Sequence, residues 1–402
     1  MIILFTIVLS GSIIPFIFFE GYNYLLILFL IVLLFVVFVK SKIIKVSLFS
    51  FLFLISVTLF LLLHLIMKNS FTYMNSYFGL LARFTIAFLI TQIFTFRSFI
   101  EKYIVIISII VFISLLFYFG GILRPDLISS LPVSYNDAGT GYRHLYIYFF
   151  QGISSWNRRN SGIFWEGGAF QLYINVALLF RLFYLRRFSK RDVFINLLLL
   201  SGIITTFSTI GILFLLFQLL LIFNREKLIV KFTIYFLLFL MIFSTDFVYT
   251  LIISKFLSSS SSGSERLIGM ISDLVMFFNF PILGAGFEYI NTHFDRIAYS
   301  LGSQVPSSTN SITGSLAMYG LFFTMYILTP LLRLPKYISS KLVEQITAFI
   351  IILLLLSSQG VLYQLLFICL MFYVVQGKFT RQVYNLEDIY ENSHNSQCVQ
   401  DR

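Results

Sequence analysis

The sequence predicts an all-α integral membrane protein with about twelve transmembrane helices and two large extracytoplasmic loops. Three observations lead to this fold class: the composition, the lengths of the apolar runs, and the distribution of basic residues between them. Of the 402 residues, 59% are hydrophobic and 11% are charged, whereas a soluble domain has roughly 25% charged residues. A chain with so few polar side chains cannot cover its own surface with them, so we expect lipid around it.

The apolar runs have the length that a helix needs to cross a bilayer. The first run lacks the basic segment and cleavage site of a signal peptide, so we expect it to be a retained span. The regions 193–223 and 344–376 are each long for one span and short for two. Each contains a polar break, at 205–209 and 357–360, which suits a tight hairpin or a broken helix that lines a cavity. We expect spans at 2–19, 22–39, 43–67, 76–96, 103–121, 168–184, 193–206, 208–223, 228–250, 311–332, 344–357 and 360–376.

Basic residues test this map, because cytoplasmic loops of membrane proteins are enriched in Lys and Arg. With a cytoplasmic N-terminus, nineteen of the 28 Lys and Arg residues fall in cytoplasmic segments and eight fall outside. Merging either doubtful region into a single span would place basic loops on the outside. Twelve spans with both termini in the cytoplasm therefore fit best. The net charge of +11 then reflects membrane topology, and we expect no nucleic-acid partner.

Two of the outside loops are long, and loops of more than about fifteen residues are usually functional or disordered. In the first, the aromatic-rich segment 143–150 is expected to form an interfacial helix. In the second, apolar residues at 265–278 recur at helical spacing, and an apolar turn follows at 279–286. The chain thus divides into five N-terminal transmembrane helices (1–121), the first large loop (122–167), four transmembrane helices (168–253), the second large loop (254–310), three transmembrane helices (311–376) and a cytoplasmic tail (377–402).

The segment 158–168 places three charged residues beside a predicted span, in a chain where charge is scarce. Arg158 and Arg159 lie on the outside, against the trend of the basic residues, and guanidinium groups suit bidentate contacts with phosphate. Glu166 comes where the loop meets the next helix, as a helix cap or as a catalytic carboxylate, and two glycines after it allow close backbone approach. The alternative interpretation is a solvated loop flank with its arginines near lipid headgroups.

Two further arginines are candidate phosphate ligands. Arg83 lies about seven residues inside its span, where a charged side chain is costly and indicates function. It would line a polar cavity and contact a lipid phosphate or pair with Glu166, unless it extends to the outer headgroups. In the second loop, Glu265, Arg266 and Asp273 share one face of the expected helix, which would otherwise face water. Of these three we assign Arg266 to the phosphate.

The remaining polar residues give weaker signals. His144 and His293 lie in the outside loops and are candidate bases, although a lone loop histidine is more often incidental. Small residues at 307–320 indicate close helix packing. The sequence has no cluster of metal ligands, no nucleotide-binding loop and no dinucleotide fingerprint, so we expect no cofactor and no metal. Cys369 and Cys398 form no plausible disulfide or metal site.

This arrangement of charges favours one class of substrate. Chemistry outside the cytoplasm has no ATP, so an activated donor must arrive on a carrier. A polyprenyl-pyrophosphate sugar fits, because its tail partitions into the bilayer and its pyrophosphate lies at headgroup level. Arginines would stabilise the charge of the leaving pyrophosphate, and a carboxylate or histidine would deprotonate the attacking hydroxyl.

Three short stretches resemble the bacterial O-antigen polymerase and ligase superfamily. Residues 158–178 resemble the segment after the large periplasmic loop of O-antigen polymerases. Arg266 with 280–286 resembles a second-loop segment shared with the ligases. Thr309-Asn310, nine residues and then Gly320 resemble the ligase signature, in which histidine stands at the position of Thr309. The lack of that histidine argues against a ligase and leaves the base open, with Glu166 first and His293 or His144 behind it.

The resemblance implies a membrane glycosyltransferase of the bacterial inner membrane, with its active site on the periplasmic face. It would transfer a growing glycan from undecaprenyl pyrophosphate to the next lipid-linked repeat unit. Its partners would be the lipid-linked donor and acceptor, with a chain-length regulator and a flippase in the same membrane. The alternatives are an O-antigen ligase, a lipid-linked oligosaccharide flippase or transporter, which would have internal pseudo-symmetry, and a structural scaffold.

Overall fold

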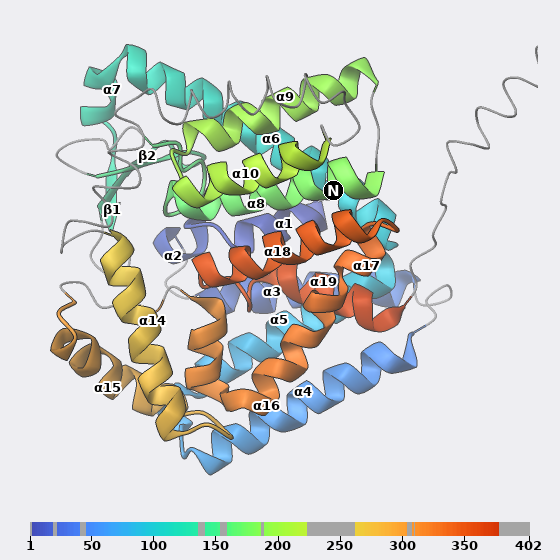
Figure 1. Ribbon diagram of the computed structural model, residues 1–402, viewed down its shortest axis with the longest axis vertical. Coiled ribbons are helices and arrows are strands. Elements are labelled where there is room, and N and C mark those ends of the chain that lie inside the picture. Colours follow the sequence, from blue (N-terminus) through green and yellow to red (C-terminus); the bar gives the residue numbers. More distant parts are fainter. Residues whose placement is uncertain are drawn as a thin grey trace, which may run out of the picture.

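The computed structural model describes residues 2–18, 22–40, 46–135, 141–152, 159–185, 189–222, 262–303, 308 and 310–377, and these are mostly helical (Figure 1). Every expected span within these ranges contains a helix. The expected span at 228–250 and the cytoplasmic tail from 378 onward lie outside them. In the part of the chain that is described, five helical stretches are long and apolar enough to cross a membrane, which fits a multi-pass membrane protein: Leu48–Met67, Phe71–Ile93, Phe96–Leu123, Gly167–Leu185 and Ser311–Ile338.

The N-terminal helices follow the expected runs with one difference. The first run is divided at Gly11, because the Ser10 and Ser12 hydroxyls bond to nearby carbonyls and compete with the helical pattern. The Tyr173 hydroxyl also comes so close that a Cβ at Gly11 would lie 1.7 Å from it. The helices are α1 (Ile2–Ser10), α2 (Ile14–Phe18), α3 (Tyr22–Lys40), α4 (Leu48–Met67), α5 (Met74–Ile93) and α6 (Phe96–Leu123), with a short 3-10 turn, Phe71–Tyr73, before α5.

Two helices form the centre of the bundle. Every residue of α8 (Gly167–Leu179) is buried, as are the residues of α19 (Leu365–Gln376) up to Val374. Helix α8 packs against α6, α9 and α10, and α19 packs against α5 and α16. Helix α19 is apolar up to Val374, and α8 is apolar except for Gln171 and Asn175, whose side chains bond to each other at 2.8 Å. Burial on every side is therefore what their sequences favour. The helices around them are a π-helical turn (Phe180–Leu185), α9 (Lys190–Thr205), α10 (Thr209–Ile222), α16 (Ser311–Arg333), α17 (Pro335–Ile338) and α18 (Leu342–Ser358).

Both expected polar breaks are present. Helix α9 ends at Thr205 and α10 begins at Thr209, with Phe207 between them at a φ of 47°. Helix α18 ends at Ser358 and α19 begins at Leu365. We call residues 358–364 the linker. Its backbone carbonyls and amides are released from the helical pattern and available to side chains.

The first loop contains a small sheet where the sequence analysis expected an interfacial helix. Residues 143–150 contribute to two antiparallel strands joined through Tyr146, whose φ of 61° is incompatible with a right-handed helix. Arg143 pairs with Val133 on one side and Phe150 on the other. Aromatic residues favour strands when one face is buried, so the helix prediction was wrong. The elements are α7 (Pro125–Ser129), β1 (Val133–Tyr135), β2 (Gly141–His144) and β3 (Phe149–Gln151), in the order β1-β2-β3.

The second loop contains the expected helix, α14 (Ser262–Asn279), and an unexpected one, α15 (Phe287–Ser300). Figure 1 shows α14 at the left-hand end of the bundle, running across the direction of α4. Its polarity is inverted, because Asp273 is buried while the side chains of one outer stripe are apolar and exposed. That stripe consists of Leu267, Ile271, Val275 and Phe278, which are 53%, 38%, 39% and 74% exposed. The exposed positions of α15 are mostly polar instead: Glu288, Asn291, Thr292, Asp295 and Arg296.

The turn at 281–286 inserts its backbone into a kink in α16. Gly320 has φ 78° and ψ −177° inside that helix, which interrupts it. The freed groups bond to the turn, since Leu321 N donates to Pro281 O at 2.9 Å and Ala285 N donates to Ala317 O at 2.7 Å. The small residues expected to pack helix against helix therefore also admit a turn of backbone.

Candidate functional site

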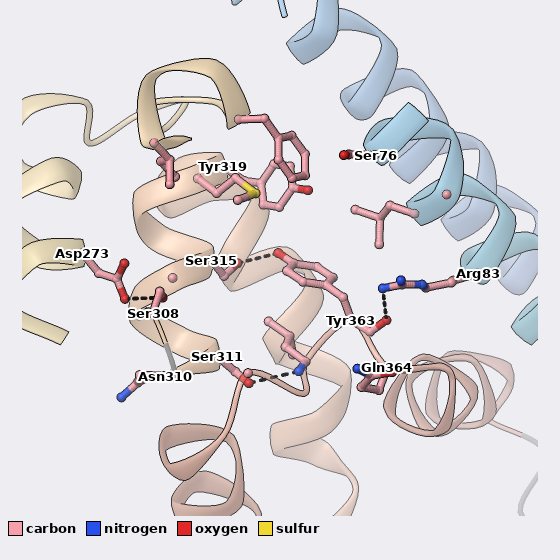
Figure 2. Close-up of a pocket in the computed structure, with 18 residues that line it drawn as sticks. Ser76, Arg83, Asp273, Ser308, Asn310, Ser311, Ser315, Tyr319, Tyr363 and Gln364 are labelled. Atoms are coloured by element: carbon pink, nitrogen blue, oxygen red, sulfur yellow. Dashed lines mark hydrogen bonds between the residues drawn. The ribbon is translucent and has the colours of Figure 1, made fainter. Parts of the chain in front are cut away.

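A cavity of about 440 Å³ opens between α5, α14, α15, α16 and the linker. Its lining is rich in small and hydroxylated residues, with few charges (Figure 2). Small residues keep this space open, because a Cβ at Gly314 would lie 2.9 Å from the Ser308 hydroxyl. The lining residues are Ser76, Gly79, Leu80, Arg83, Asp273, Phe287, Ile290, Ser308, Asn310, Ser311, Gly314, Ser315, Met318, Tyr319, Gly360, Leu362, Tyr363 and Gln364.

Arg83 lies at the wall of this cavity, as one of its two sequence interpretations requires. It is half-buried on α5, and its Nη1 donates to the Tyr363 carbonyl of the linker at 3.3 Å. Figure 2 shows the side chain extending from α5 toward the linker, with Tyr363 between it and Ser315. The guanidinium is therefore positioned to serve a ligand in the cavity.

Asp273 enters the cavity from the side opposite Arg83 (Figure 2). It is 1% exposed, and its Oδ2 accepts hydrogen bonds from Ser308 Oγ at 2.8 Å and Thr313 Oγ1 at 2.9 Å. Burial raises the pKa of this carboxyl to about 6, against the two hydroxyls, which lower it. Sequence analysis placed Asp273 on the face of Arg266 but gave it no role. The signal that could have identified it was a single carboxylate within the apolar run 267–278.

Glu166 and Arg266 form an ion pair beside the cavity. Arg266 Nη2 lies 3.2 Å from Glu166 Oε1, with the two side chains 31% and 23% exposed. The same oxygen accepts a hydrogen bond from Gln359 Nε2 at 2.7 Å. Glu166 occupies the N-cap position of α8 without a capping hydrogen bond from its side chain. A Cβ at Gly168 would lie 2.9 Å from Gln359 Nε2, so this glycine permits the close approach that the sequence suggested.

Arg159 lies near this ion pair and caps a helix end. Its Nε donates to Thr206 O at 3.1 Å and its Nη2 to Phe207 O at 3.3 Å, where α9 ends. A cation is favourable at the C-terminal end of a helix, where the helix dipole is negative. Burial lowers the pKa of Arg159, while the charge of Glu166 raises it and that of Arg266 lowers it. The neighbouring Arg158 lies outside the described residues.

The two histidine candidates lie away from the cavity wall. His144 is buried on β2, where Nε2 lies 2.9 Å from the Ser134 hydroxyl, and burial lowers its pKa. His293 on α15 stacks on Tyr289 with ring centroids 4.0 Å apart. Neither histidine is among the residues that line the cavity. Their assignment as bases remains a prediction from the sequence without support from this geometry.

The linker connects the ion pair to the cavity. Arg266 Nη1 donates to Ser358 O at 2.8 Å, so Arg266 and Arg83 each bond to a carbonyl of this one segment. Ser311 fixes its middle, since its Oγ donates to Gln359 O and accepts from Val361 N at 2.6 Å. Sequence analysis identified the polar break but missed Gln359 and Ser311, whose partners are far away along the chain.

Comparisons with known proteins leave the family open. No family model, no curated protein and no solved structure matches this chain. The resemblance of the three short stretches to O-antigen polymerases is therefore a basis for a proposal only.

Proposed function

We propose that the chain is a polymerase of lipid-linked oligosaccharide repeat units, such as those of O-antigen or a similar surface polysaccharide. It transfers the growing glycan from undecaprenyl pyrophosphate to the next lipid-linked repeat on the periplasmic face of the inner membrane. The observation that carries this proposal is the cavity with Arg83 and Asp273 on opposite sides, joined through the linker to the Glu166–Arg266 pair. Cationic and carboxylate groups are what a pyrophosphate donor and a hydroxyl acceptor need.

The arginines supply the charge that the leaving pyrophosphate requires. Arg83 and Arg266 donate to neutral linker carbonyls, and Arg159 donates to carbonyls at the end of α9. A phosphate oxygen is the stronger acceptor for a guanidinium, because it carries negative charge and a phosphate can accept two parallel N–H bonds from the planar fork. Exchange of carbonyl for phosphate at these arginines would stabilise the developing negative charge. The sequence assigns Arg158, which lies outside the described residues, to the same role.

Glu166 fits a positioning role in this scheme better than that of a base. Its Oε1 is engaged by both Arg266 and Gln359, so the carboxylate orients a guanidinium and a side-chain amide at once. A general base needs an oxygen within hydrogen-bond reach of the acceptor hydroxyl. Within the cavity lining, Asp273 is the carboxylate with that access.

The proposal includes twelve spans with both termini in the cytoplasm, so both large loops are periplasmic. Reporter fusions after Phe150 and after Ser300 are expected to show periplasmic activity and no cytoplasmic activity. A fusion after Lys341, in a basic loop, is the matched control and should report the cytoplasm. A cytoplasmic signal from either of the first two positions would contradict the twelve-span arrangement.

Deletion of the gene from its bacterium tests the reaction. If the chain is the polymerase, gel separation of the surface polysaccharide should change from a ladder to caps of a single repeat, and a plasmid copy should restore the ladder. Uncapped lipid A-core would indicate the ligase instead, and repeat units retained on the cytoplasmic face would indicate the flippase. An unchanged ladder would exclude all three functions.

A further inference from the structure

The two charged groups of the cavity have different kinds of hydrogen-bond partner. Arg83 and Asp273 are the charged residues among the described lining. Arg83 donates to a backbone carbonyl, whereas Asp273 accepts bonds from two neutral hydroxyls, both at Oδ2. No described cation forms a salt bridge with Asp273. A buried carboxylate is costly without a compensating charge, so its retention at the wall of a cavity points to use there.

The surroundings of Asp273 direct the carboxylate toward the cavity. Helix α14 buries Ser272, Asp273 and Met276 and exposes its apolar stripe. Asp273 lies against the start of α16, where it accepts a hydrogen bond from Thr313. A Cβ at Gly314 would lie 3.7 Å from Oδ2, and glycine at that position leaves the space open. No described residue donates to Oδ1, so this oxygen can accept a hydrogen bond from a ligand hydroxyl.

We propose that Asp273 is the general base of the transfer and takes the proton of the acceptor sugar hydroxyl, with the donor pyrophosphate held at Arg83. This assignment rests on the proposed function and adds the residue that activates the acceptor. Hydroxyl and amide groups from Ser308, Asn310 and Ser315 line the same cavity as the two charges. Such groups are suited to hydrogen bonding with sugar hydroxyls.

The step balances without a cofactor. The acceptor oxygen forms a bond to the anomeric carbon of the donor while the bond from that carbon to the pyrophosphate oxygen breaks. The electron pair of the broken bond stays with the pyrophosphate, whose added charge Arg83 stabilises. The acceptor proton moves to Asp273 and later passes to water. Base catalysis by a positioned side chain contributes about 100- to 10,000-fold.

The protonation of Asp273 gives the step a pH dependence. Burial raises its pKa to about 6, so the form that accepts a proton is lost as the pH falls through that value. The titratable groups that line the cavity with it are Arg83 on α5, Tyr319 on α16 and Tyr363 on the linker. Helix α15 adds only Phe287 and Ile290 to the lining.

The test uses the full-length protein in lipid nanodiscs with lipid-linked repeat units extracted from the deletion strain. Asp273→Asn should bind the lipid-linked repeat within about twofold of wild type and polymerise it at least about 100-fold more slowly. Asp273→Glu should recover part of the rate with a shifted pH profile. Asp295→Asn, at an exposed position on α15, is the matched control and should polymerise at the wild-type rate.

The outcomes distinguish failure of the base assignment from failure of the polymerase function on which it rests. Polymerisation by Asp273→Asn at the wild-type rate would overturn the base assignment and leave the polymerase function intact. Wild-type protein that makes no polymer would instead remove the proposed function itself. If Asp273→Asn fails to fold, the wild-type pH profile decides. A single-proton loss of turnover near pH 6 supports Asp273, and a rate that is constant from pH 5 to 8 overturns it.

Discussion

Replacing Arg266 by alanine is expected to abolish the polysaccharide ladder while the protein remains in the membrane at its normal level. The substitution removes a guanidinium that bonds to Glu166 and to the linker carbonyl of Ser358. Loss of one donor to developing negative charge costs about 100- to 1,000-fold in rate. At 31% exposure the side chain is open to a ligand, so most of this loss should come from substrate stabilisation and little from the fold.

Controls separate the charge of Arg266 from its geometry. Arg266→Lys keeps the charge but loses the planar fork, so we expect partial activity. Arg296→Ala, at an exposed position on α15, should leave the ladder unchanged. If Glu166 acts through Arg266, Glu166→Gln should add little to Arg266→Ala, because mutations of one contacting pair are not additive. Ladders of normal length from Arg266→Ala would contradict pyrophosphate binding at this arginine.

Gly320→Ala is expected to prevent folding of the second loop onto the bundle. A Cβ at this position would lie 2.2 Å from the Ile282 carbonyl oxygen and 2.6 Å from Gly284 N. These are backbone atoms, so no side-chain rotation relieves the contact. The φ of 78° with a ψ of −177° is also a conformation that essentially only glycine adopts, and the strain alone costs about 1–3 kcal/mol.

Two other glycines separate the backbone strain of Gly320→Ala from the collision of its Cβ with the turn. Gly302 has a φ of 91° and no atom within 4 Å of an added Cβ, so Gly302→Ala tests the strain without the collision. Gly120→Ala in α6 has neither penalty and should be neutral or stabilising by up to about 1 kcal/mol. The measurement is the melting temperature and monodispersity of the detergent-purified protein. Equal melting temperatures for Gly320→Ala and Gly302→Ala would show that the inserted turn contributes nothing.

The helices were predictable from the sequence because their signals are local. Apolar runs of bilayer length and the polar breaks at 205–209 and 357–360 depend on neighbouring residues only, and the structure contains both breaks. The segment 143–150 was predicted wrongly for a related reason. A run of aromatic residues fits an interfacial helix or a half-buried hairpin equally, and the turn at Tyr146 decides between them through its backbone conformation.

The candidate site was predictable only in part, because its contacts join distant segments. Glu166 meets Arg266 across 100 positions and Gln359 across 193. Because charged residues are rare in this chain, the sequence identified the arginines and Glu166 as separate candidates. No local pattern indicated that the linker would join two of the arginines, or that Asp273 would reach the cavity through hydroxyls at Ser308 and Thr313.

The inverted polarity of α14 determines how the second loop can be studied. Excised as a peptide, residues 254–310 would place the Asp273 carboxylate in water without its Thr313 partner, which belongs to α16. The face that contains Met276, which is buried in the whole chain, would then be exposed in addition to the apolar stripe from Leu267 to Phe278, and such a surface promotes aggregation. Antibodies raised against that peptide would recognise surfaces that are buried in the native protein. Binding and labelling experiments on this loop therefore require the whole chain in a membrane or in detergent.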